Sequence, residues 1–262
     1  MPAKTSLINS ALGRIGLELR KSGRRIADLK ALPQSPSSGW MVEFIGTQGI
    51  GKTTLNNAVY KYFKDDWFLR SDLNQTGPAP TASKDLEDLH QNLVFMKLAR
   101  LKEEKSGAWR TITLTRQMSK VAGESLTMLS NSFPRGFILD ESIVKNFPRE
   151  VLSLPDDVTA PIWNKRALIH LRARELDFVV ARYQSRVAER AQKGLLQNAA
   201  EDDQVRARVE ADNAIFEQIC KKAESFGCPV LTVFADDDHQ EIVRKIVAFE
   251  KSLLNGDPVS PQ

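Results

Sequence analysis

The sequence predicts an α/β fold of three layers, in which helices cover both faces of a parallel sheet. Two observations support this prediction. Short, continuously apolar segments, typical of strands buried on both faces, alternate along the chain with longer segments of helical periodicity. In addition, a glycine-rich segment joins the first such strand to the first such helix, a connection that commonly binds phosphate groups.

The chain of 262 residues is long enough for one large domain and a short additional segment. We expect a basic helical segment with a linker over residues 1–39, the main domain over residues 40–256, and a tail over residues 257–262. Residues 1–39 contain seven basic and two acidic residues, a net charge of +5, whereas the rest of the chain carries −1. Since the main domain is not basic, we expect no specific nucleic-acid partner.

The N-terminal segment predicts a helix over residues 6–20, with apolar residues near one face and basic residues on the other. A linker rich in proline and serine follows over residues 33–38. Two interpretations stay open: the helix packs on the main domain, or it contacts anionic lipid or a partner protein. No apolar run approaches the roughly 20 residues that cross a membrane. We expect a cytoplasmic protein, with the inner face of the membrane as the alternative location.

The first strand of the main domain is expected at residues 40–45 and the first helix at residues 54–63. Between them, residues 46–53 read Gly-Thr-Gln-Gly-Ile-Gly-Lys-Thr, a complete G-x-x-x-x-G-K-T phosphate loop. Its glycines let successive N–H groups point at an anion, Lys52 can reach the outer phosphates, and the Thr53 hydroxyl can bind Mg²⁺. The helix N-terminus adds the positive end of its dipole. The predicted nucleotide-binding residues here are Gly46, Thr47, Gln48, Gly49, Ile50, Gly51, Lys52, Thr53 and Thr54.

The second apolar run covers residues 67–70 and leads to Asp72, 20 residues after Lys52. A carboxylate at this strand end is expected to face the γ-phosphate and to hold or deprotonate an attacking hydroxyl. The alternative is a loop aspartate that begins a turn. Residues 73–83 are rich in Pro, Gly, Thr and Ser and predict a loop. Residues 85–105 predict a helix, because leucines recur at helical spacing on one face.

A helix is expected at residues 119–130, followed by a buried strand at residues 137–139 that ends at Asp140 and Glu141. After such a strand, the Asp140 carboxylate is expected to hold Mg²⁺ opposite Thr53. The alternative is a helix cap, a role for which aspartate is equally suited. Glu141 is expected to orient water or to contact the substrate.

A further strand at residues 167–171 leads into a run of arginines. Arg182, Arg186 and Arg190 recur at spacings of four and share one face of a helix predicted over residues 175–193. Guanidinium groups stabilise the charge on a phosphoryl group during transfer and can close a site against water. The alternative is a solvated basic face paired with neighbouring acids. A helix over residues 207–225, a strand over 230–234 and a helix over 240–254 complete the expected elements.

The phosphate loop and residues 167–186 together resemble the P-loop small-molecule kinases, the nucleoside, nucleotide and shikimate kinase group of the P-loop NTPase superfamily. Gly46, Gly51, Lys52 and Thr53 match the loop of this group, and Arg182 and Arg186 match its lid arginines. Asp140 falls where the group has an acid, although this chain continues Asp-Glu-Ser rather than Asp-Arg. By spacing alone, Asp72 matches the substrate-holding acid of the shikimate-kinase-like branch.

The end of the chain also resembles this group, in its last strand and adenine-side loop. This resemblance implies that Ala235 and Asp236 lie near the base of a bound nucleotide, and that Lys52, Asp72, Asp140, Arg182 and Arg186 perform the chemistry. The segments expected to line the acceptor pocket are residues 73–120 and 141–163, where Arg110, Arg116 and Lys120 are available for an anionic group. The predicted substrate-binding residues are Asp72, Arg110, Arg116 and Glu141.

These patterns predict a kinase that uses ATP and Mg²⁺ to phosphorylate a hydroxyl or phosphate of a small molecule, including sugars and lipid-linked compounds. The alternative is a P-loop ATPase that uses water as the acceptor and acts as a switch or partner-regulated protein. A GTPase is not favoured, because residues 164–167 read Asn-Lys-Arg-Ala and lack the aspartate of the guanine-binding motif. A sulfotransferase is not favoured either, because such an enzyme normally lacks the Gly-Lys-Thr ending of the loop.

Overall fold

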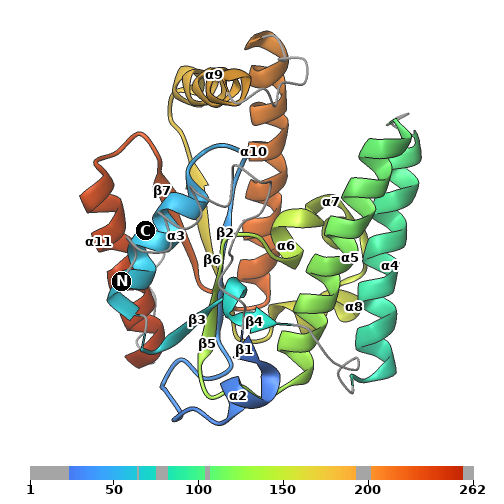
Figure 1. Cartoon of the computed structure of the whole chain (residues 1–262), viewed down its shortest axis with the longest axis vertical. Helices are drawn as coiled ribbons and strands as arrows, with labels where there is room; N and C mark the ends of the chain where they lie inside the picture. Colours follow the sequence, from blue (N-terminus) through green and yellow to red (C-terminus); the bar gives the residue numbers. More distant parts are fainter. Residues whose placement is uncertain (1–23, 64, 75–81, 104–106, 193–201, 256–262) are drawn as a thin grey trace, which may run out of the picture.

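The computed structural model describes residues 24–63, 65–74, 82–103, 107–192 and 202–255. Its centre is a five-stranded parallel sheet with helices on both faces (Figure 1), which confirms the predicted three-layer α/β fold. The strands lie in the order β3-β5-β2-β6-β7. Their bounds are Met41–Ile45 for β2, Trp67–Leu69 for β3, Gly136–Leu139 for β5, Arg166–Arg172 for β6 and Val230–Phe234 for β7.

Strand β2 lies at the centre of the sheet and is buried along its whole length. Met41 pairs with Phe137 of β5 on one side and with Arg166 of β6 on the other. Because all five strands are parallel, their carboxyl ends meet at one edge, where ligands bind in open α/β sheets. The phosphate loop after β2, Asp140 after β5 and the arginine run after β6 therefore share this edge.

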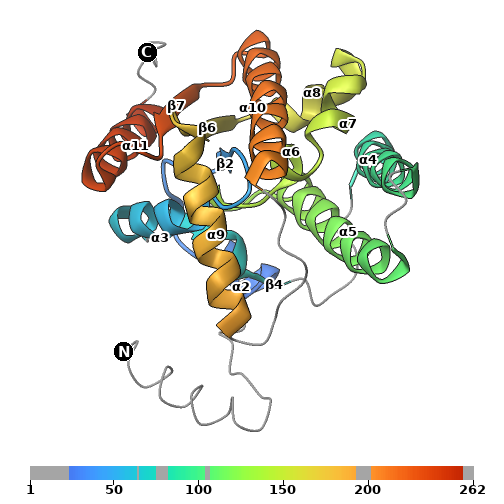
Figure 2. The same ribbon diagram turned by 90° about the horizontal axis from the view of Figure 1, so that it is seen from above.

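Two helices cover one face of the sheet: α3 (Lys52–Phe63) and α11 (His239–Asn255), which pack on each other (Figure 2). The other face is covered by two long helices, α5 (Ala108–Ser130) and α10 (Asp202–Ser225), and a third, α4 (Lys84–Glu103), packs on α5 further from the sheet. Three short helices lie on the same side, α6 (Ile143–Asn146), α7 (Pro148–Ser153) and α8 (Asp156–Trp163). Helix α9 (Leu176–Gln192) lies beyond the carboxyl end of the strands (Figure 1).

Helix α5 begins at Ala108, eleven residues before the predicted start at residue 119. Three threonines in this first part weaken the helical pattern. The structure shows how the helix accommodates two of them, because Thr111 and Thr115 donate their hydroxyls to the carbonyls of Gly107 and Thr111, one turn earlier. The short helices α6–α8 fall in a region for which the sequence predicted no regular element.

The described part of the N-terminal segment packs on the sheet. Strand β1 (Arg24–Arg25) pairs with β4 (Leu73–Asn74), and helix α2 (Ile26–Lys30) follows. Leu29 of α2 is completely buried in an apolar cluster with Met41, Phe68 and Phe137. The helix predicted over residues 6–20 and the tail from residue 257 lie outside the described residues. The division at residue 39 and the contact with lipid or a partner stay predictions.

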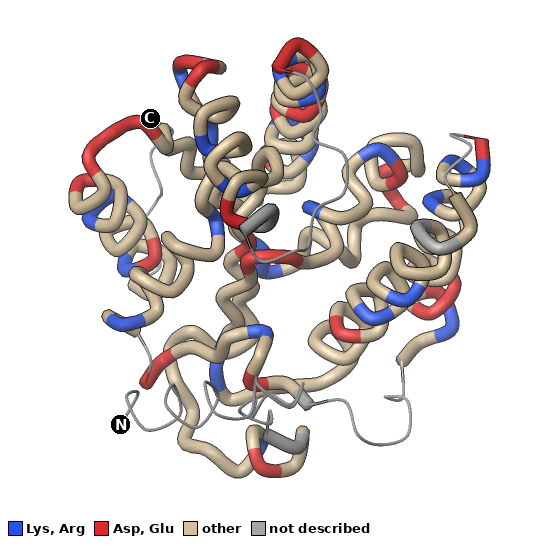
Figure 3. Tube along the Cα trace, turned by 45° about the horizontal axis from the view of Figure 1, so that its top comes forward, with Lys and Arg blue, Asp and Glu red and all other residues tan. Residues whose placement is uncertain are grey.

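Within the described residues, no helix combines the length and apolar character needed to cross a membrane. Acidic and basic residues are interspersed along the helices instead of gathering on one broad face (Figure 3).

Candidate active site

The phosphate loop leaves β2 in a conformation that requires glycine. Gly46 has a φ of 131°, and a Cβ at this position would lie 2.2 Å from the Leu171 carbonyl oxygen of β6. Gly51 has a φ of 113°, and helix α3 begins at the next residue. The sequence therefore folds locally into a tight strand-to-helix turn, with the N-terminal end of a twelve-residue helix at the loop.

Lys52 is folded back onto the loop that precedes it. Its Nζ donates hydrogen bonds of 2.7 Å to the carbonyl oxygens of Gly46 and Thr47. Burial lowers the pKa of Lys52 to about 7, and the Lys145 ammonium adds to this lowering, whereas the carboxylates of Glu141, Asp212 and Asp140 oppose it. The Lys52 ammonium thus lies inside the loop. Burial disfavours its charged form, and an anionic ligand bound there would stabilise that form.

Thr53 and Asp140 meet at the carboxyl ends of β2 and β5. The Thr53 hydroxyl donates a hydrogen bond of 2.9 Å to Asp140 Oδ2. These are hard oxygen ligands of the kind that Mg²⁺ prefers. Among the described residues, no group of three His, Cys, Asp or Glu side chains could hold a metal ion. Mg²⁺ bound here would therefore need further ligands from water and a nucleotide, the usual arrangement for this ion.

The arginines of α9 reach over the phosphate loop. Arg182 Nη1 donates to the Ile50 carbonyl oxygen at 3.1 Å, and its guanidinium lies over the Phe178 ring. Arg186 extends toward Gly49, where its Nη1 lies 3.5 Å from the Cβ position of that glycine. The side chain of Arg190, the third predicted lid arginine, lies outside the described part of the chain. Two of the three predicted lid arginines therefore face the loop.

Glu141 lies across the phosphate loop from the arginines of α9 and forms two ion pairs. Its carboxylate is 3.2 Å from Lys145 Nζ and 3.7 Å from Arg70 Nη1. Arg70 also contacts the buried carboxylate of Glu124 on α5. Burial raises the pKa of Glu141, but the Lys145 ammonium, with further help from Arg70 and Lys52, outweighs burial and holds that pKa below its ordinary value. Glu141 is therefore ionised at neutral pH.

A completely buried ion pair holds the segment that carries Glu141 and Lys145. Arg166 of β6 donates to Glu43 Oε2 of β2, and both side chains are fully buried. Glu43 Oε1 also accepts a hydrogen bond of 2.8 Å from the backbone N–H of Lys145. Burial raises the pKa of Glu43, and the Arg166 guanidinium opposes this rise. The pair fixes the start of α6 and so positions Glu141 and Lys145.

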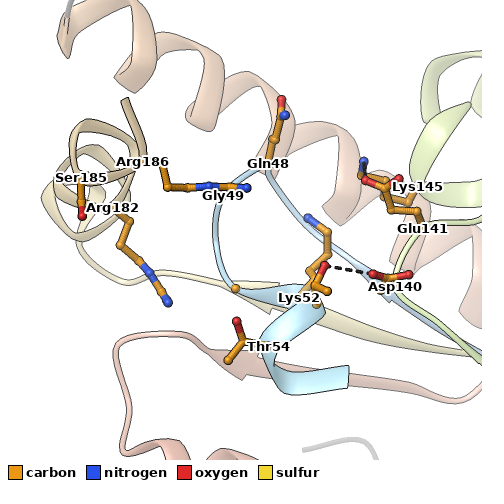
Figure 4. A pocket seen from close by; sticks show the side chains of 12 residues that line it. Gln48, Gly49, Lys52, Thr54, Asp140, Glu141, Lys145, Arg182, Ser185 and Arg186 are labelled. Atoms are coloured by element: carbon orange, nitrogen blue, oxygen red, sulfur yellow. Dashed lines mark hydrogen bonds and ion pairs between the residues drawn. The ribbon is translucent and has the colours of Figure 1, made fainter. Parts of the chain in front are cut away.

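These groups enclose a cavity of about 410 Å³ at the edge of the sheet (Figure 4). We call its side formed by Lys52, Arg182 and Arg186 the loop–lid wall, and the side formed by Asp140, Glu141 and Lys145 the β5–α6 wall. The lining residues are Gln48, Gly49, Gly51, Lys52, Thr53, Thr54, Asp140, Glu141, Lys145, Arg182, Ser185 and Arg186.

A smaller hollow of about 40 Å³ adjoins the loop. Ile50, Gly51, Thr54 and Arg182 line it together with Ala235, one of the two residues predicted near the base of a nucleotide. The other, Asp236, instead holds the start of the lid, because its Oδ2 accepts hydrogen bonds from the backbone N–H groups of Arg174 and Glu175 at 3.0 and 3.3 Å.

Two predicted substrate-binding residues lie outside the cavity, and the side chain of a third is not described. Asp72 Oδ2 accepts a hydrogen bond of 2.9 Å from the Leu69 backbone N–H, and the residue does not line the cavity. Arg116 is exposed on α5 and is likewise not a lining residue. The side chain of Arg110 lies outside the described part of the chain. The substrate roles of these three residues stay predictions.

Sequence reasoning missed two charged residues of the site. Lys145 follows Asp140 by five positions, but no regular element was predicted there. Asp212 lies in α10 and its Oδ2 accepts a hydrogen bond of 2.9 Å from the Thr47 hydroxyl, which ties α10 to the phosphate loop. In the sequence, Asp212 is one acidic residue within a predicted helix, and nothing distinguishes it there from an acid exposed to solvent.

No family model matches the chain, and no curated protein matches its sequence. Solved structures of small-molecule kinases resemble it. A deoxyadenosine kinase from M. mycoides has a TM-score of 0.43 and 17% identity over 81% of this chain and 99% of the kinase. A gluconokinase from Sinorhizobium meliloti 1021 has a TM-score of 0.39 and 12% identity, covering 83% of this chain and 95% of its own.

A shikimate kinase from Aquifex aeolicus has a TM-score of 0.39 and 9% identity over 82% of this chain and 99% of the kinase. At identities of 9–17%, this resemblance is one of fold alone.

Proposed function

We propose that this chain is a phosphotransferase that moves the γ-phosphate of ATP to a hydroxyl or phosphate of a small molecule. One observation carries the proposal. Arg182 and Arg186 of the lid lie across one cavity from the carboxylates of Asp140 and Glu141, with Lys52 between them (Figure 4). Phosphoryl transfer needs cations around the transferring group and carboxylates for the metal ion and the attacking hydroxyl.

The donor side binds the nucleotide phosphates. The backbone N–H groups of the phosphate loop and the N-terminus of α3 receive the β- and γ-phosphates. Lys52 exchanges its bonds to the Gly46 and Thr47 carbonyls for bonds to phosphate oxygens. Arg182 and Arg186 stabilise the negative charge that spreads over the phosphoryl oxygens during transfer.

Mg²⁺ would be held by the Thr53 hydroxyl and the Asp140 carboxylate, whose oxygens already converge at 2.9 Å. When bound, it neutralises charge on the phosphate oxygens. In the transfer, the oxygen of the acceptor hydroxyl forms a bond to the γ-phosphorus, and the bond from that phosphorus to the bridging oxygen of ADP breaks. The hydroxyl proton passes to one of the two carboxylates at the end of β5, Asp140 or Glu141.

Hydrolysis of ATP by water is the second candidate, because an adjacent pair of acids, Asp140 and Glu141, follows β5 as in P-loop ATPases. Hydrolysis would use the same carboxylates to orient a water molecule. The cavity beside the phosphate loop, with a volume of about 410 Å³, gives room for an acceptor larger than water and so favours transfer.

ATP turnover, measured with and without a panel of hydroxyl-bearing acceptors, tests the proposal. We expect an acceptor to raise ADP formation, with one phosphorylated product formed for each ADP. Strong hydrolysis that no acceptor increases, and that Glu141→Gln abolishes, would establish the ATPase instead.

A further inference from the structure

The charges in the cavity are divided between its two walls. Lys52, Arg182 and Arg186 form the loop–lid wall, which carries only cations (Figure 4). The β5–α6 wall combines two carboxylates, Asp140 and Glu141, with one ammonium group, Lys145. Asp140 would be engaged by Mg²⁺, which serves the nucleotide phosphates, and the charges of Glu141 and Lys145 then balance each other. Apart from the metal ion, the described part of the β5–α6 wall therefore offers an acceptor no excess positive charge, and an anion entering the cavity is drawn to the other side.

The cations near the β5–α6 wall are already bound to carboxylates. Lys145 Nζ lies 3.2 Å from Glu141, and the Lys145 side chain is only 15% exposed. Arg70 contacts Glu141 and Glu124 together. Lys120 lies 3.8 Å from the other oxygen of Glu124. A phosphate at this wall would have to compete with the carboxylates of Glu141 and Glu124 for these cations.

Recognition of a phosphorylated acceptor depends on cations with free hydrogen-bond donors, most often arginine in a forked arrangement. A carboxylate in the same place repels a phosphate. It accepts hydrogen bonds from hydroxyl groups, however, and Glu141, 37% exposed, faces the cavity with an ionised carboxylate. The β5–α6 wall thus suits a ligand that donates hydrogen bonds and carries no negative charge.

We propose that the acceptor is an uncharged small molecule with several hydroxyl groups, of the nucleoside or sugar class, and not a phosphorylated compound. This inference rests on the proposed phosphotransferase function and narrows it. Glu141 accepts a hydrogen bond from an acceptor hydroxyl, and its ion pairs with Lys145 and Arg70 keep phosphate-bearing acceptors out.

Matched pairs of acceptors test the inference on the full chain with ATP and Mg²⁺. The uncharged members are four nucleosides, ribose and glucose, and the charged members are their monophosphates. We expect kcat/KM for the best uncharged acceptor to exceed that of its monophosphate at least tenfold. Preference for the monophosphate would overturn the inference and leave the phosphotransferase intact. ADP formation that no acceptor increases would overturn the phosphotransferase, and this inference with it.

Glu141→Gln provides a second test, because it releases Lys145 and Arg70 from their shared carboxylate. We expect the ratio of kcat/KM for the monophosphate to that for its uncharged partner to rise at least tenfold. This ratio cancels any general loss of activity. Glu224→Gln, an exposed acid near the end of α10, is the control and should leave the ratio unchanged. An unchanged ratio in Glu141→Gln would overturn the assigned role of Glu141.

Discussion

The two walls of the cavity hold their cations in different ways. On the loop–lid wall, Lys52 and Arg182 donate to backbone carbonyls of the phosphate loop. At the β5–α6 wall, the carboxylate of Glu141 holds Lys145 and the neighbouring Arg70. A carbonyl orients a cation without cancelling its charge, whereas a carboxylate does cancel it. The first wall is thus prepared for phosphates and the second for an uncharged ligand.

The support below the walls differs as well. The loop–lid wall depends on backbone conformation at Gly46, and the β5–α6 wall depends on a buried ion pair, Glu43 with Arg166. A residue with a side chain is strained in the backbone conformation of Gly46. Removal of one partner of a buried ion pair leaves the other charge uncompensated and destabilises the fold. Substitutions at these positions therefore test each wall separately.

The largest effect is expected for Glu43→Gln. The Arg166 guanidinium is fully buried against Glu43, so this substitution leaves a buried cation without its counter-charge. We expect the free energy of unfolding, measured with urea, to fall by about 3–5 kcal/mol. The control is Glu241→Gln, which removes an exposed pair with Lys245 and should cost less than about 1 kcal/mol. Equal effects of the two substitutions would show that the pair does not support the wall.

Lys52→Met tests the loop–lid wall directly. Removing one preorganised donor to a developing charge typically lowers a rate about 10²–10³-fold, or roughly 3–4 kcal/mol. We expect phosphoryl transfer to fall by this factor and ATP affinity, measured by calorimetry, to fall as well. Lys61→Met, at an exposed position of the same helix, should change neither. Full transfer activity in Lys52→Met would show that this cation does not serve the phosphates.

Gly46→Ala tests the backbone requirement of the same wall. The added Cβ would lie 2.2 Å from the Leu171 carbonyl oxygen at a φ of 131°, so the loop must move. A residue with a side chain pays about 1–2 kcal/mol for positive φ alone, and we expect more than about 2 kcal/mol of lost ATP binding energy. Gly107→Ala is the matched control, because its Cβ would have no neighbour within 4 Å. Unchanged affinity in Gly46→Ala would contradict the close approach to β6.

Most of the loop–lid wall could be predicted from the sequence, because each of its two segments, the phosphate loop and the arginine run, forms a recognisable local pattern, although Arg182 and Ile50 lie 132 residues apart. The phosphate loop is continuous, and the apolar runs beside it mark its strand and helix. Strand β7, at Val230–Phe234, matches the predicted range, since a buried strand of five residues leaves a continuous apolar run.

The β5–α6 wall could not be predicted to the same extent, because the residues that hold it in place belong to no local motif. Glu43 and Arg166 meet across neighbouring strands although 123 residues separate them. Arg70, Glu124 and Glu141 come from three different segments of the chain. The spacing that suggested Asp72 as a substrate-holding acid did not reveal its hydrogen bond to Leu69, which depends on the tight turn after β3.

A buried carboxylate outside both walls sharpens the comparison, because it shows what burial does without a partner. Glu250 of α11 is completely buried, neither of its carboxylate oxygens has a hydrogen-bond partner among the described residues, and burial raises its pKa to about 8. Between pH 4.5, near the ordinary pKa of glutamate, and pH 8, the unfolded chain has lost this proton while the folded chain keeps it. The free energy of unfolding therefore falls as pH rises through this window.

Glu250→Gln removes this titration and should flatten the pH dependence by up to about 1.4 kcal/mol per pH unit. We expect the variant to be more stable than the parent at pH 8, whereas Glu43→Gln is less stable there. Urea unfolding at pH 5, 6.5 and 8 measures both differences. The same substitution thus has opposite signs at two fully buried glutamates, because Glu43 balances a buried cation and Glu250 balances none. Parallel pH profiles for Glu250→Gln and the parent would show that Glu250 finds a partner, and would remove the contrast.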